Sequence, residues 1–194
     1  MNAVPVGHGS YMSMEVVRAA IGYDDSIFLG GGEPTLHPQF GDILAECIAK
    51  SDMVGCITNG TNRGWSLILA ALGSNKGNEH FYAALSQDEF HDVDMVDADV
   101  IEAFEKYADI RSVTRIAPVG RAADLDYDLP DGMSISASCC CDEWTIDPNG
   151  DIRPCGCVDA PILGNLLGDD SWGDASCLRE ERPECRMEKQ NVKV

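Results

Sequence analysis

Residues 27–40 read IFLGGGEPTLHPQF, an apolar run followed by three glycines, a glutamate and a proline. A short apolar run that ends in glycines is typical of a buried strand. Apolar side chains then recur at the helical spacing, at Phe40, Ile43, Leu44, Cys47 and Ile48. The stretch therefore predicts a strand, a glycine-rich loop and a helix.

The same pattern repeats along the first part of the chain. Apolar runs at 53–57, 81–85 and 113–117 each end in a polar or glycine-containing turn, and they are spaced by roughly 30 residues, the length of a βα repeat. Helical spacing recurs between them, at Trp65, Ile68, Leu69 and Leu72 and at Val100, Ile101, Phe104 and Tyr107. An earlier helix is expected from Ser13, a good N-cap, through Ile21. Strands that alternate with helices predict an α/β fold with a parallel sheet and helices on its outer face.

The last part of the chain has a different pattern. Trp144 and Ile146 alternate with polar residues and lead into Asp-Pro-Asn-Gly at 147–150. Those four residue types favour a type I turn, so a β-hairpin is expected there. Residues 158–172 are interpreted as a loop. A domain boundary near 128–138 divides the chain into 1–130 and 131–194.

Composition excludes several classes of protein. With 44 % hydrophobic residues the chain can build a core, so most of it is expected to be folded. Thirty-three acidic against 14 basic residues give a charge of −19, which argues against a nucleic-acid partner. No run of about 18 apolar residues exists, so no membrane span is expected.

Nine cysteines are many for this length, and seven of them lie between Cys139 and Cys185. The first 14 residues lack a basic start and an apolar segment, so no secretory leader is expected. The predicted localisation is therefore cytoplasmic, where clustered cysteines bind metals or act in redox chemistry more often than they form disulfides.

Candidate site residues follow the predicted strands, where the loops of a βα array gather on one face. Gly31 and Gly32 could let backbone N–H groups approach a ligand, Glu33 could hold an ammonium group, and Pro34 stiffens the turn. A glycine-rich connection with a solvated glutamate is the alternative. Asn59 and Ser86 end the next two strands, and ordinary turn or loop roles stay open for both.

IFLGGGEPTLHPQF resembles the second-strand segment of radical S-adenosylmethionine (radical SAM) enzymes, whose Gly-Gly-Glu-Pro motif binds the methionine amino group. ITNGT at 57–61 and ALSQDEFHD at 84–92 resemble the segments of the next two strands, and APVGRA at 117–122 a later strand end. The resemblance covers about residues 13–125. It implies S-adenosylmethionine as cofactor, held by Gly31, Gly32, Glu33 and Pro34, with Asn59 and Ser86 lining the site and Arg121 pairing with a carboxylate.

The family also carries Cys-x-x-x-Cys-x-x-Cys after its first strand, and this motif is absent here. Its three thiolates hold a [4Fe–4S] cluster with one open iron. The expected fold is therefore a partial (β/α) TIM-like barrel lacking its first strand, with a small Cys-rich cap that contains a β-hairpin. We expect either a truncated product or a protein that has lost this cluster, and no catalytic activity from these 194 residues alone.

The Cys-rich end resembles the SPASM or twitch extension of that family. There a cysteine, a spacer of about ten residues, Gly-x-x-x-x and a second cysteine bind an auxiliary [4Fe–4S] cluster. Here Gly150 and Cys155 follow the cysteine cluster at that spacing. The implied ligands are Cys140, Cys155, Cys177 and Cys185, with Cys139, Cys141 and Cys157 as substitutes. A structural zinc site or free buried thiols are the alternatives.

Two functions follow from these resemblances. A complete enzyme of this kind generates a 5′-deoxyadenosyl radical that abstracts hydrogen from a substrate, here a small molecule or a peptide, and needs a reductase or another electron donor. The alternative is a non-catalytic iron–sulfur or zinc module that acts in binding or electron transfer.

Overall fold

The computed structural model describes residues 11–73, 80–87, 93–111, 144–153 and 162–168. The chain divides into two compact units, Val17–Arg115, and Met1–Val16 together with Ile116–Val194. No helix within the described ranges is long and apolar enough to cross a membrane.

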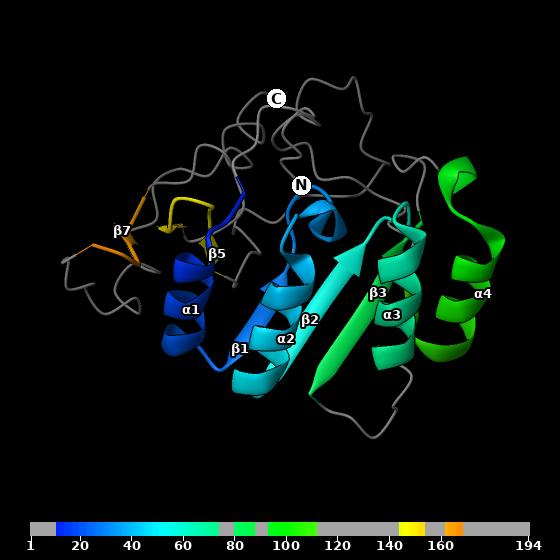
Figure 1. The fold of residues 1–194 in the computed structure, drawn as a ribbon, viewed down its shortest axis with the longest axis horizontal. Helices are drawn as coiled ribbons and strands as arrows, with labels where there is room; N and C mark the ends of the chain where they lie inside the picture. The colour runs from blue at the N-terminus through cyan, green and yellow to red at the C-terminus, as the bar shows by residue number, and fades with distance from the viewer. Residues whose placement is uncertain (1–10, 74–79, 88–92, 112–143, 154–161, 169–194) are drawn as a thin grey trace, which may run out of the picture. The chain divides into compact units, whose positions relative to one another are not determined.

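The unit Val17–Arg115 contains a four-stranded parallel sheet in the order β1-β2-β3-β4 (Figure 1). The strands are β1 (Ser26–Leu29), β2 (Met53–Thr58), β3 (Phe81–Ser86) and β4 (Asp109–Arg111). The helices are α1 (Met14–Tyr23), which begins in the other unit, α2 (Phe40–Lys50), α3 (Arg63–Gly73) and α4 (Ala98–Tyr107). Two 3-10 turns, η1 (Pro34–Leu36) and η2 (Val93–Met95), follow β1 and β3. The predicted α/β class and parallel sheet are confirmed.

The predicted strands and helices that fall within the described residues form where the apolar periodicity predicts them. Ser13 caps α1 as expected, since its Oγ accepts the Val16 N–H at 3.3 Å. The apolar run at 113–117 lies outside the described residues, and β4 comes before it in the chain.

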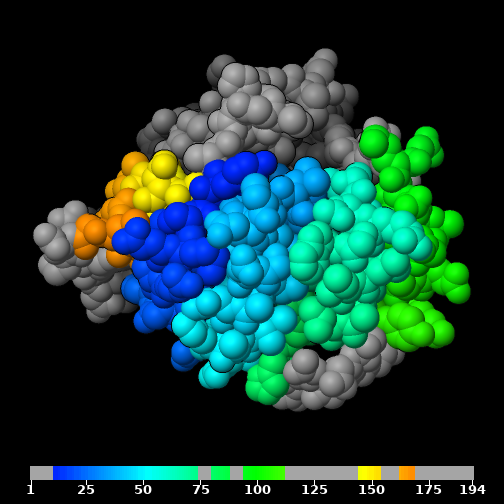
Figure 2. All heavy atoms as spheres, in the orientation of Figure 1, coloured from blue at the N-terminus to red at the C-terminus, as the bar shows by residue number. Residues whose placement is uncertain are grey.

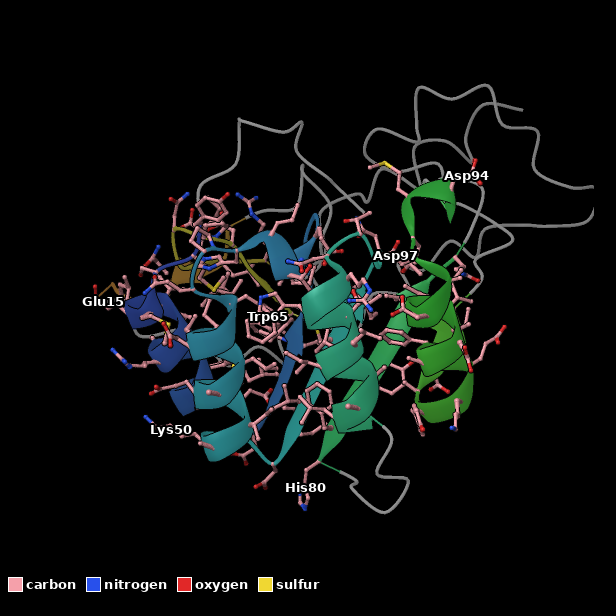
Figure 3. All side chains as sticks on the ribbon, turned by 45° about the vertical axis from the view of Figure 1, so that its right-hand side comes forward. Glu15, Lys50, Trp65, His80, Asp94 and Asp97 are labelled. Carbon is pink, nitrogen blue, oxygen red and sulfur yellow. The ribbon has the colours of Figure 1, made fainter. Side chains whose placement is uncertain are left out.

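The core of this unit lies between the sheet and helices α2 and α3, which lie in front of the strands in Figure 1. In the space-filling view their atoms meet and hide most of the sheet (Figure 2). The Phe40 ring meets Trp65 edge-on, with centroids 5.1 Å apart, and Val54, Cys56 and Leu69 are fully buried. Trp65 points inward between the two helices in Figure 3.

The opposite face of the sheet carries aromatic side chains. Phe28 of β1 pairs in register with Gly55 of β2, and Gly55 with Tyr82 of β3. A Cβ on Gly55 would lie 2.2 Å from the Phe28 ring, so only glycine lets that ring lie across the strand. Phe28 and Tyr82 have centroids 6.3 Å apart, and Phe28 is 50 % exposed.

The second sheet is antiparallel, in the order β5-β6-β7. Its strands are β5 (Thr145–Ile146), β6 (Asp151–Arg153) and β7 (Gly164–Asn165). The predicted hairpin is confirmed: Gly150, at φ +85°, donates its N–H to the Asp147 carbonyl at 2.9 Å. The prediction that 158–172 is all loop is wrong at β7, which pairs with β6 and is held by Asn165 Nδ2 donating to Asp151 Oδ1 at 2.7 Å.

Candidate functional site

Three predicted site residues lie at one edge of the parallel sheet. Glu33 follows β1, Asn59 follows β2, and Ser86 is the last residue of β3. Because neighbouring parallel strands end at the same edge, the loops that carry these residues lie next to one another. This edge is the candidate site.

Glu33 joins the loops that follow β1 and β2. Its Oε1 accepts hydrogen bonds from Thr35 N at 3.1 Å, Thr35 Oγ1 at 2.5 Å and Thr58 Oγ1 at 2.8 Å. Its Oε2 accepts one, from Asn59 N at 2.6 Å. An ionised carboxylate offers about four lone-pair positions, so Oε2 keeps room for another donor. The solvated-loop alternative for Glu33 does not describe this geometry, because the carboxylate accepts hydrogen bonds from its own loop and from the end of β2.

Two asparagines shape the loop after β2. Asn59 Oδ1 accepts from Thr61 N at 2.9 Å and Thr61 Oγ1 at 2.8 Å, which is the turn role that stayed open for Asn59. Asn62 precedes α3, and its Nδ2 donates to the Thr35 carbonyl at 3.0 Å. The loops after β1 and β2 are thus bonded to each other by Glu33 and by Asn62.

The glycine loop after β1 is exposed. Gly31 has φ +119°, a conformation that favours glycine. Gly30 and Gly32 have φ angles outside the left-handed region that favours glycine. A Cβ on either residue would meet no atom within 4 Å. The fold in the described residues therefore does not require glycine at 30 or 32. Pro34 occupies the start of η1, where a missing N–H costs nothing.

Ser86 lies at the carboxyl end of β3 and is 5 % exposed. It pairs in register with Arg111 of β4, so both side chains lie on the sheet face that carries Tyr82. Arg111 is not among the predicted site residues, and its strand contains a single apolar residue. Arg121 lies outside the described residues.

Sequence reasoning also missed Thr35, Thr58 and Asn62. Each is a polar residue in or beside a strand-ending loop, and Thr58 directly precedes the predicted Asn59. A threonine two residues after a glutamate is the signal that could have indicated Thr35, because a carboxylate often accepts the N–H two residues on.

The two cysteines of the first part are poor metal ligands. Cys47 and Cys56 are fully buried, and burial raises the pKa of the Cys47 thiol from 9.0 to about 11 and that of Cys56 to about 12. Both stay protonated near neutral pH, whereas metals bind the thiolate. The predicted ligands Cys139, Cys140, Cys141, Cys155, Cys157, Cys177 and Cys185 lie outside the described residues.

These raised pKa values predict a loss of stability in alkali. Folding holds protons on Cys47 and Cys56 that the unfolded chain releases near pH 9, so stability falls as pH rises from 9 towards 12. Between pH 8 and pH 10 the free energy of unfolding should fall by roughly 1 kcal/mol for each thiol. Urea unfolding at the two pH values measures this. The Cys47→Ala/Cys56→Ala variant should lose less stability over the interval, and an equal loss would refute the assignment.

Two histidines make hydrogen-bond contacts with the backbone near them. His37 Nδ1 accepts the Gln39 N–H at 3.0 Å, and His80 Nδ1 lies 2.7 Å from the Asp52 carbonyl. Figure 3 places His80 at the end of the sheet opposite Asp94 and Asp97, so it does not belong to the candidate site. Within the part of the chain that the structure describes, no group of three or more His, Cys, Asp or Glu side chains could hold a metal.

Comparison of the chain with protein-family models, with curated proteins and with solved structures finds no match.

Proposed function

We propose that the chain binds S-adenosylmethionine at the carboxyl edge of its parallel sheet and is a radical SAM-type protein, or part of one. The sheet would then be a segment of a (β/α) barrel, whose helices cover the outer face and whose inner face carries Phe28 and Tyr82. The resemblance of residues 27–40 to the family motif supports this assignment, and the geometry of the edge fits it.

One observation carries the proposal: glycines stand at 30 and 32 where the described fold leaves room for side chains. A ligand that approaches the backbone closely would explain both glycines, because a Cβ would occupy its space. Gly31, Gly32 and Glu33 would hold the methionine end of the cofactor. Among the residues that the structure describes, only the Asn59 N–H donates to Glu33 Oε2, so this oxygen can also accept an ammonium group.

The Cys-rich end would hold an auxiliary [4Fe–4S] cluster. The hairpin supports this, because Thr145 pairs with Arg153 and the chain therefore enters and leaves it at adjacent positions. Cys155 follows Arg153 by two residues. In a complete protein of this kind, S-adenosylmethionine and a second cluster with one open iron, whose Cys-x-x-x-Cys-x-x-Cys motif is absent from these 194 residues, would supply a 5′-deoxyadenosyl radical. That radical would abstract hydrogen from a small-molecule or peptide substrate, with electrons from a reductase or similar donor. Iron binding without S-adenosylmethionine binding would favour the non-catalytic electron-transfer module.

The test is a pair of matched glycine variants. Gly32→Ala should weaken S-adenosylmethionine binding by about fivefold to a hundredfold, because a methyl group forced into a filled site costs about 1–3 kcal/mol. Isothermal titration calorimetry measures the affinity. These variants give a cleaner test than Glu33→Ala, which would also release Thr35, Thr58 and Asn59.

Gly22→Ala is the control. Gly22 lies in α1, and a Cβ there also meets no atom within 4 Å. Its affinity for S-adenosylmethionine should equal that of the unmodified chain. Absence of binding to the unmodified chain, or equal affinity in Gly32→Ala, would contradict a cofactor site at this loop.

A further inference from the structure

Thr58, the last residue of β2, is a buried hydroxyl at the candidate site. It is 1 % exposed, and its single hydroxyl proton is donated to Glu33 Oε1 at 2.8 Å. The same oxygen accepts the Gly60 N–H at 3.1 Å. One hydroxyl therefore binds both the carboxylate that follows β1 and the turn that follows β2.

The bonds to Glu33 are divided unequally between its two oxygens. Oε1 accepts three, two from Thr35 and one from Thr58, whereas Oε2 accepts one from Asn59. Each carboxylate oxygen has about two good acceptor directions, so the described residues saturate Oε1 and leave one direction at Oε2. Thr35 belongs to the same loop as Glu33 and moves with it. Among the described residues, Thr58 is the side chain that ties Glu33 to a neighbouring strand.

We propose that Thr58 is a positioning residue: by fixing Oε1 it leaves Oε2 as the oxygen that accepts the primary ammonium group of the ligand. This inference rests on the proposed function. A carboxylate held in one orientation binds an ammonium group better than a rotating one, because the side chain has already lost its conformational entropy before the ligand binds. The hydrogen bond from Gly60 N–H to Thr58 Oγ1 adds to this effect, since it fixes the position of the hydroxyl that donates to Glu33.

The experiment compares two ligands, S-adenosylmethionine and its analogue that lacks the α-amino group. Thr58→Val removes the hydroxyl, keeps the shape of the side chain and suits a strand. Its affinity for S-adenosylmethionine should fall about tenfold, the size of one lost hydrogen bond to a charged group. Its affinity for the deaminated analogue should stay unchanged. Thr58→Ser keeps the hydroxyl and should restore the preference for the amine.

A merely structural role predicts a different result, because a distorted loop would weaken both ligands by the same factor. Equal losses, or wild-type affinity for both ligands in Thr58→Val, would overturn the positioning role alone. If the unmodified chain binds neither ligand, the proposed function falls and the positioning role with it. Thr58→Ala removes the same hydroxyl and replaces Thr58→Val if circular dichroism shows that the valine variant does not fold.

Discussion

Gly60→Ala is expected to destabilise the unit Val17–Arg115 by about 2–5 kcal/mol. Gly60 has φ +83°, where a Cβ costs about 1–2 kcal/mol. That Cβ would also lie 2.7 Å from Leu85 Cδ1 and 2.9 Å from Val96 Cγ1, which adds an overpacking cost of about 1–3 kcal/mol. Urea unfolding followed by far-UV circular dichroism measures the change.

Gly22→Ala again provides the control, because its backbone is helical and its surroundings are open. It should change the free energy of unfolding by less than about 1 kcal/mol, in the stabilising direction. Equal stability of Gly60→Ala and the unmodified chain would mean that the turn after β2 is not fixed as the structure has it. The result also bears on the site, since Gly60 donates to Thr58, which in turn donates to Glu33.

The elements that could be predicted from the sequence are those with several apolar side chains at a regular period. α2 and β2 are examples, because each buries a continuous apolar stripe. β4 has only Ile110 between two charged residues and is formed by its pairing with β3, which no local pattern reveals. β7 is a glycine and an asparagine, and its pairing with β6 outweighs the loop preference of both residues.

The sequence predicted where the candidate site lies in the fold, but not the hydrogen bonds within it. Runs that end in polar residues predicted that Glu33, Asn59 and Ser86 would lie at one edge of the sheet. The bond from Thr58 to Glu33 depends on the register of β1 and β2, which pairs Leu29 with Cys56 and so brings the two strand ends level. Periodicity predicts strands but not the register of parallel strands, so Thr58 could not be assigned from the sequence.

The Cys-rich end leads to the prediction with the largest effect. The chain, purified without oxygen and reconstituted with iron and sulfide, is expected to hold about four iron atoms. Cys155→Ala should remove most of this iron and the broad visible absorption of the thiolate–iron bonds. Cys155 is the choice because β6 ends at Arg153, two residues earlier, and the turn at Gly150 sets where the chain leaves the hairpin.

Cys47→Ala is the matched control for Cys155→Ala, because it removes a thiol whose burial keeps it protonated. Its iron content should equal that of the unmodified chain. Stoichiometric zinc without iron uptake would overturn the cluster and favour the structural zinc site. Equal iron loss in both variants would mean that removing either thiol unfolds the chain, and that outcome would contradict Cys155 as a ligand. Loss confined to Cys155→Ala is the result that the hairpin geometry and the cysteine spacing jointly predict.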